Sequence, residues 1–149
     1  MPNFIVGARL HDYGKGTPDE LFGQVSADGF AAVQLAYKKC VPTVKVAETV
    51  AAEKAHHIQV AVLGTYVELA INDESRLCNV ADFKSQLAVC RALGAGCIGT
   101  ETTAMSKQPA GTTRAQAQEL LCRSLAEILP AAEALGVTVG IEPVTYHSM

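Results

Sequence analysis

The sequence lacks the features that would place it at a membrane or on nucleic acid. No charged N-terminal region followed by an apolar segment opens the chain, and no apolar run approaches the ~20 residues that a helix needs to span a bilayer. It has no run of basic residues, and its net charge of −3 gives no positive surface for DNA or RNA. We therefore expect a soluble cytoplasmic protein that binds neither a membrane nor a nucleic acid.

The cysteines and histidines of the sequence do not indicate a disulfide or a metal site. The five cysteines are odd in number and contain no C-x-x-C pair, which indicates buried free thiols in a reducing compartment rather than disulfides or zinc ligands. His56 and His57 close a predicted helix, where imidazoles interact well with the last carbonyl groups. We interpret this pair as structural and not as a metal site.

What the sequence does contain is a regular alternation of strands and helices. With 149 residues and 49% hydrophobic content, it can form one globular domain. Apolar runs at 4–8, 30–35, 58–63 and 97–100 predict strands, and a fifth strand ends at Glu142, where Pro143 prevents further pairing. Capping boxes at Thr17–Glu20 and Thr113–Gln116 start two of the four predicted helices, and Pro130 should kink or restart the last one.

This alternation predicts an α/β fold with a parallel sheet and right-handed crossovers, either doubly wound or part of a (β/α)8 barrel. No G-x-G-x-x-G motif or P-loop follows the first strand, which disfavours a doubly wound nucleotide-binding sheet. Polar residues follow strand after strand, and in a barrel these carboxyl ends converge on one mouth. They are His11, Asp12, Gln34, Tyr66, Glu68, Glu101 and Glu142. We predict a partial TIM barrel with five parallel strands and four helices.

Five segments resemble the sugar phosphate isomerase/epimerase family, which has a xylose isomerase-like TIM barrel and belongs to the AP endonuclease 2 superfamily. They are Arg9–Tyr13, Gly29–Leu35, Ala61–Gly64, Gly99–Thr102 and Gly140–Pro143. The resemblance implies a metal-dependent isomerase or epimerase of a sugar or related hydroxy-ketone. It also implies that Glu142 is a catalytic residue and one ligand of a divalent metal, which would be Mn²⁺, Mg²⁺, Co²⁺ or Zn²⁺.

The resemblance further implies that the chain builds only part of its fold. In that family the remaining metal ligands are an Asp, a His and a second Glu from the sixth to eighth strands, and a complete barrel has ~250 residues. We therefore expect residues 1–149 to form a single incomplete domain, the N-terminal portion of such a barrel, which is inactive alone. Because a partial barrel has an unpaired edge on each side, we also expect a homo-oligomer that forms through these edges.

Five further residues are candidate contacts for a small sugar substrate, each with a structural alternative. His11 and Glu101 lie at strand ends, but His11 could be a hydrogen-bonded structural residue and Glu101 could be satisfied by Thr100, Thr102 or the backbone. Tyr66 and Glu68 could shape the pocket or serve in capping and loop packing. His147 could line the same mouth or lie exposed near the end of the chain.

The remaining cations and the other functional classes complete the predictions. Lys38, Lys39 and Arg76 could meet a substrate phosphate, although we interpret them as solvated surface charge.

The alternative to an isomerase or epimerase is a half-barrel without enzymatic activity, either a fragment or an assembly unit. An endonuclease IV-like metallohydrolase is a weaker alternative. Such an enzyme should carry clustered histidine ligands and a basic DNA-binding face, and the sequence shows neither.

Overall fold

A computed structural model describes residues 5–36 and 45–144, which form a five-stranded parallel sheet in the order β1-β2-β3-β4-β5. The predicted five strands and four helices of a partial TIM barrel are confirmed. The elements are β1 (Gly7–Arg9), the 3-10 helix η1 (Leu10–Tyr13), α1 (Pro18–Ala27), β2 (Ala32–Ala36), α2 (Val46–His56), β3 (Gln59–Gly64), α3 (Asp73–Ala92), β4 (Cys97–Glu101), the 3-10 helix η2 (Met105–Lys107), α4 (Arg114–Leu135) and β5 (Thr138–Glu142).

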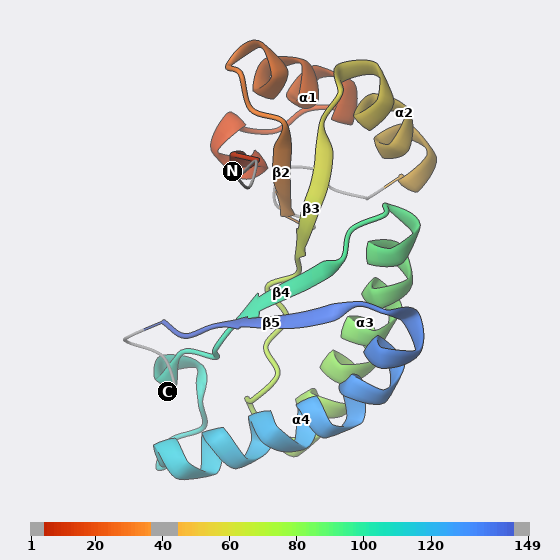
Figure 1. The fold of residues 1–149 in the computed structure, drawn as a ribbon. Helices are drawn as coiled ribbons and strands as arrows, with labels where there is room; N and C mark the ends of the chain where they lie inside the picture. The colour runs from red at the N-terminus through yellow and green to blue at the C-terminus, as the bar shows by residue number, and fades with distance from the viewer. Residues whose placement is uncertain (1–4, 37–44, 145–149) are drawn as a thin grey trace.

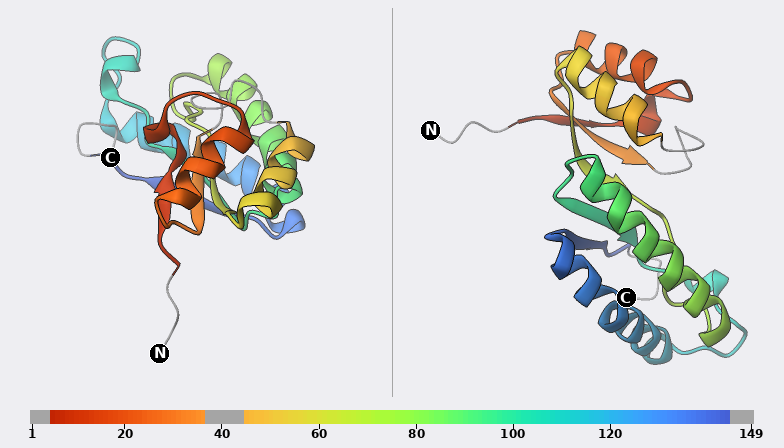
Figure 2. Two further views of the ribbon diagram at one scale, coloured as in Figure 1. Left: turned by 90° about the horizontal axis from the view of Figure 1, so that it is seen from above. Right: turned by 90° about the vertical axis from the view of Figure 1, so that its right-hand side faces the viewer.

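The helices pack in two pairs along the sheet. Helices α1 and α2 lie together beside β2 and β3, and α3 and α4 lie together beside β4 and β5 (Figure 1). Turned views show the same pairing (Figure 2). The apolar core lies where helices meet strands and includes Phe22, Leu63, Phe83, Ile98 and Ile128, each with an exposed fraction of 0%. Among the described residues, the helices all lack the length and apolar character that a bilayer span requires.

The helix boundaries follow the predicted signals. Both predicted capping boxes are present. The hydroxyls of Thr17 and Thr113 each accept a hydrogen bond from the backbone amide three residues on, and the side chains of Glu20 and Gln116 accept one from the amides of Thr17 and Thr113 in return. Helix α4 runs through Pro130 without ending, so of the two predicted effects, a kink or a restart, the restart does not occur. Burial of Ile128 and Ala132 on either side of the exposed Pro130 keeps both halves of α4 on the same core.

An irregularity in β3 changes which of its side chains face the core. Val33 of β2 pairs with Val60, but the next residue of β2, Gln34, pairs with Val62, so Ala61 is an extra residue in β3. Before this bulge, Val33 and Val60 are both buried in the core, with exposed fractions of 1% and 0%. After it, Gln34 and Val62 both line a pocket. The bulge thus turns the end of β3 toward the same side as Gln34.

Helices α3 and α4 are joined by a buried arginine. The Arg76 side chain is 5% exposed, and its Nη1 lies 2.5 Å from Glu127 Oε1. Asp73 extends the network, since its Oδ1 lies 3.5 Å from Arg76 Nε and 2.9 Å from Arg123 Nη2. The hydrogen bond from Arg76 to Glu127 raises the pKa of the guanidinium, which stays charged. Arg76 is therefore buried and ion-paired, and its interpretation as solvated surface charge is wrong. The sequence did not show this pairing, because the partner Glu127 lies 51 residues away.

We predict that Arg76→Ala lowers the free energy of unfolding by about 1–3 kcal/mol, because it removes a buried side chain and its ion pair with Glu127. Lys84→Ala, on an exposed position of the same helix, is the matched control and should change stability by less than about 0.5 kcal/mol. Urea unfolding followed by circular dichroism measures both. Equal stabilities of the two variants would show that the Arg76 network contributes nothing.

A second prediction concerns Gln86, a core amide on α3 with an exposed fraction of 1%. Neither its Nε2 nor its Oε1 has a hydrogen-bond partner. Since an unsatisfied buried polar group costs about 1–3 kcal/mol, Gln86→Met should raise the free energy of unfolding by about this amount. Gln24→Met, at an exposed position of α1, should leave it nearly unchanged. A loss of stability in Gln86→Met would mean that the amide is satisfied.

Candidate functional site

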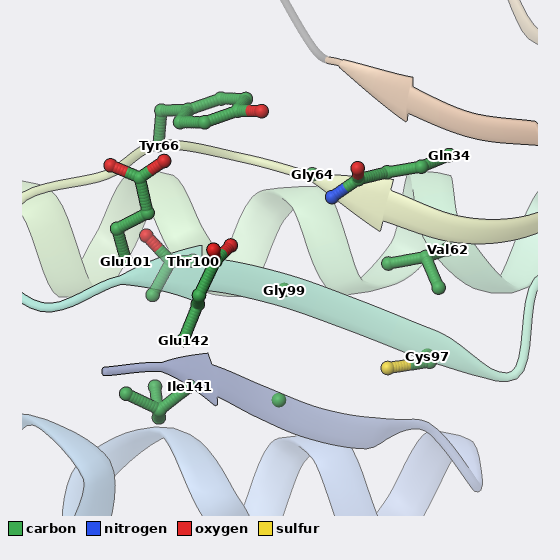
Figure 3. Close-up of a pocket in the computed structure, with 11 residues that line it drawn as sticks. Gln34, Val62, Gly64, Tyr66, Cys97, Gly99, Thr100, Glu101, Ile141 and Glu142 are labelled. Atoms are coloured by element: carbon green, nitrogen blue, oxygen red, sulfur yellow. The ribbon is translucent and has the colours of Figure 1, made fainter. Parts of the chain in front are cut away.

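A pocket opens on the sheet near the carboxyl ends of β2 to β5. Its volume of about 240 Å³ is below the ~300–1,000 Å³ range of pockets for drug-sized ligands, so it suits a small molecule. Figure 3 shows the carboxylates of Glu101 and Glu142 rising from neighbouring strands toward Tyr66, with the Gln34 amide on the β2 side. The lining residues are Gln34, Val62, Gly64, Tyr66, Cys97, Gly99, Thr100, Glu101, Gly140, Ile141 and Glu142.

The register of β4 and β5 brings the two carboxylates together. Glu101 and Glu142 are direct partners in the parallel ladder, so their side chains emerge on the same side of the sheet. Pairing continues beyond the strand ends, because the Thr102 amide donates to the Glu142 carbonyl at 3.1 Å and Thr102 Oγ1 accepts from the Val144 amide at 3.3 Å. Thr102 is 1% exposed, so it holds the end of β5 against β4.

Glycines form the floor of the pocket below the carboxylates. Gly99 and Gly140 pair with each other in the β4–β5 ladder, one layer below Glu101 and Glu142. A Cβ atom on Gly64 would lie 3.3 Å from Gln34 Nε2 and 3.5 Å from Tyr66 Cε2. These positions leave free the space that branched side chains fill in the interior of most barrels.

Tyr66 stands at the rim in an uncommon backbone conformation. Its φ of 56° lies in the left-handed region, which is unfavourable for a bulky residue away from a helix end. Its ring meets that of His11 edge to face, with centroids 6.3 Å apart and an interplanar angle of 85°. Burial raises the pKa of the Tyr66 phenol, as do the charges of Glu101 and Glu142, while the charge and hydrogen bond of Arg9 oppose them. The phenol therefore keeps its proton at neutral pH.

Arg9 is a residue of this rim that the sequence analysis did not single out. Its Nη2 donates to His11 Nε2 at 2.5 Å, so that nitrogen is unprotonated, and its Nε lies 3.9 Å from Asp12 Oδ2. Arg9 is the last residue of β1, and a position at the carboxyl end of a strand was the available signal. The structure thus places His11 against Tyr66 and Arg9 against His11, and of these three residues Tyr66 lines the pocket with Glu101 and Glu142.

Glu68 lies beside the pocket rather than in it. It lines a smaller adjoining pocket of about 170 Å³ with Tyr66 and Glu101, and its carboxylate pairs with Lys107. Thr100 donates its hydroxyl to the Val67 carbonyl at 3.0 Å, so it does not satisfy Glu101 with that proton. His147, Lys38 and Lys39 lie outside the described residues.

The described residues include two neighbouring carboxylates that could contribute to a metal site. Carboxylate oxygens suit divalent cations, and Glu142 with Glu101 could provide two such ligands. Within residues 5–36 and 45–144, however, no group of three or more His, Cys, Asp or Glu side chains could hold a metal ion. These residues therefore fit a metal ion only in part, and further donors would have to come from elsewhere.

Solved structures share this fold at low sequence identity. A 3-keto-D-glucoside 4-epimerase from E. coli in its apo form is 17% identical with a TM-score of 0.81, covering 97% of this chain and 58% of that chain. The IolI protein with a bound zinc atom is 15% identical with a TM-score of 0.77, covering 97% and 54%. A family 2 AP endonuclease from Brucella melitensis is 15% identical with a TM-score of 0.75, covering 97% and 56%.

The chain thus spans a little over half the length of these structures. No curated protein sequence matches it. The xylose isomerase-like TIM barrel family matches residues 22–149, which include four of the five strands and the carboxylate pair. The chain therefore belongs to the xylose isomerase-like TIM barrel family.

Proposed function

We propose that this chain carries the carboxylate part of an isomerase or epimerase site for a keto-sugar or related hydroxy-ketone. The observation that carries the proposal is the pairing of Glu101 and Glu142 at adjacent strand ends, inside a pocket sized for a small molecule. The family match and the similarity to an epimerase that acts on a 3-keto-D-glucoside support this class of reaction. The similarity to a family 2 AP endonuclease gives weaker support to nuclease chemistry, because the chain's net charge is −3.

In this reaction Glu142 takes the proton from the carbon that bears a hydroxyl group beside the carbonyl. The C–H electron pair forms a carbon–carbon double bond, and the carbonyl oxygen takes up negative charge, giving an enediolate. An isomerisation is complete when a proton is added to the neighbouring carbon and the hydroxyl proton passes to the former carbonyl oxygen. An epimerisation is complete when a group on the opposite face adds a proton to the same carbon. Glu101 accepts a hydrogen bond from a substrate hydroxyl and so fixes the substrate beside Glu142.

A divalent cation is part of this proposal. Glu142 would be one of its ligands, and the family and the zinc-bound relative favour such an ion, with Mn²⁺, Mg²⁺, Co²⁺ and Zn²⁺ as candidates. When bound, the cation would stabilise negative charge on the substrate oxygen. For the proton transfer above, this chain supplies Glu142 as the base and Glu101 as the group that orients the substrate.

We predict that the full chain binds Zn²⁺ or Mn²⁺ stoichiometrically and that Glu142→Gln weakens this binding at least ~10-fold, because the amide removes an anionic ligand. The matched control is Glu133→Gln, at an exposed position of α4 away from the pocket, which should bind as the wild type does. Isothermal titration calorimetry with each metal salt gives both affinities. Absence of binding in the wild type would favour a half-barrel without enzymatic activity.

We also propose that two copies of the chain associate through the open edges of the sheet. The described parts of β1 and β5 each pair with a strand on one side only, and Ile5 and Val6 beside β1 are 63% and 65% exposed. Parallel pairing of β5 in each copy with β1 of the other would give the backbone groups at both open edges hydrogen-bond partners. Light scattering after gel filtration should give a mass of at least twice the 15.7 kDa of the chain. A well-folded monomer would rule out this association.

A further inference from the structure

The segment between β4 and α4 borders the candidate site and is weakly packed. We call its residues Ala104–Thr112 the strap. Every residue of the strap is exposed or half-buried. Figure 2 shows this segment, in cyan and teal, projecting from the body of the fold at the start of α4. Because a segment with few buried contacts opens at a low cost in free energy, the strap is suited to move.

Two pockets border the strap. On the side of the strand ends, Lys107 helps to close the smaller pocket of about 170 Å³ that Glu68 and Glu101 also line. On the side of the helices, the Pro109–Thr112 part of the strap lines a pocket of about 430 Å³ together with residues of α3 and α4. The strap therefore has room to move away from the strand ends without displacing the core.

Both ends of the strap are fixed, so movement would be confined to the residues between them. Thr102 and Thr103, directly before the strap, are each 1% exposed, and the Thr102 amide is bonded to the Glu142 carbonyl. Thr113, directly after the strap, caps α4. Gly111 has a φ of 85°, and glycine changes between such conformations and ordinary ones at little cost. The two ends can therefore act as hinges.

The β3–α3 segment, against which the strap lies, is held in place by other elements. Three of its consecutive carbonyl groups accept hydrogen bonds from side chains of β4, α3 and α4. The pairs are Thr100 with Val67, Asn79 with Glu68 and Ser124 with Leu69. Since these donors lie on regular strands and helices, this wall of the smaller pocket keeps its place when the strap moves.

Two neighbouring side chains hold the strap against that wall. Lys107 pairs with the Glu68 carboxylate, and the Gln108 amide donates to the Ala70 carbonyl. We call these two contacts the latch. The Lys107 and Glu68 side chains are 58% and 25% exposed, so water and salt weaken their attraction. Each contact of the latch therefore favours the closed position by a factor of only about 2–10.

We propose that the strap is a lid that opens about Thr103 and Gly111 when the latch breaks, and that opening exposes Glu101 on the side of the smaller pocket. The closed strap then limits access to one carboxylate of the pair, whereas Glu142 is exposed in either state. The inference rests on the proposed function only for the assignment of Glu101 to a substrate site. The movement itself requires neither a metal nor a sugar.

Carboxyl labelling of the full chain tests the access to Glu101. A water-soluble carbodiimide with glycine ethyl ester labels carboxyl groups, and mass spectrometry gives the rate at each one. Glu68→Gln, which weakens the latch, should raise the rate at Glu101 about 2–5-fold and leave that at Glu142 unchanged. Glu48→Gln, which removes an exposed pair with Lys45 at the start of α2, is the matched control and should change neither rate. An unchanged rate at Glu101 in Glu68→Gln overturns the lid.

Gln108→Ala separates opening of the strap from a change of charge. It removes the other contact of the latch and leaves all charges in place, so it should raise the labelling rate at Glu101 about 2–10-fold. A rise in Glu68→Gln alone would report the change of charge and overturn the lid. NMR relaxation dispersion should also detect microsecond-to-millisecond exchange of the strap amides, and both variants should shift these signals in the same direction. Strap signals without exchange overturn the inference.

The outcomes separate this inference from the proposed function. If the labelling rate at Glu101 is the same in all variants while Glu142→Gln loses metal binding, the lid is wrong and the carboxylate site stands. If the strap opens as expected while the wild type binds neither Zn²⁺ nor Mn²⁺, the proposed function fails and the lid stands.

Discussion

The parallel register between β4 and β5 is the constraint on which the candidate site depends. Ile98 of β4 is buried in the core and pairs with Val139, which packs against the same core. Since side chains alternate along a strand, burying this pair leaves Glu101 and Glu142 on the opposite side. A slip of one residue would turn Glu142 toward the helices, where an unpaired carboxylate is costly. Core packing therefore forces the two carboxylates together.

The pocket beneath them depends on two departures from regular structure in β3 and the segment after it. The extra residue Ala61 turns Val62 and Gly64 toward Gln34, and the absence of a side chain on Gly64 gives room for the Gln34 amide and the Tyr66 ring. The left-handed backbone at Tyr66 then brings its ring to the rim. Bulges and strained residues tend to lie at functional sites.

Local signals in the sequence were enough to predict the elements. Strand and helix periodicity and the two capping boxes act within a few residues, so the order of elements and the strand-end position of Glu142 could be predicted. The features that could not be predicted depend on distant partners. Arg76 is buried because Glu127 lies beside it on another helix, and Pro130 stays inside α4 because the core holds both halves of that helix.

The candidate site was predictable as a set of strand-end positions but not as an arrangement of contacts. Position alone placed His11, Tyr66, Glu101 and Glu142 at one edge. In the structure Tyr66, Glu101 and Glu142 line one pocket, and His11 lies against Tyr66. Position could not show that Glu68 faces Lys107, or that Arg9 reaches both His11 and Tyr66. Those contacts depend on side-chain direction after the strands end, where no periodicity applies.

The separation of core and pocket explains how this fold persists at 15–17% identity to the solved structures. Helix-facing side chains need only be apolar and of suitable size, so many sequences satisfy the core. Residues at the strand ends contribute little to packing, so they can change with the chemistry of the ligand. Similarity of fold therefore carries little information about the substrate.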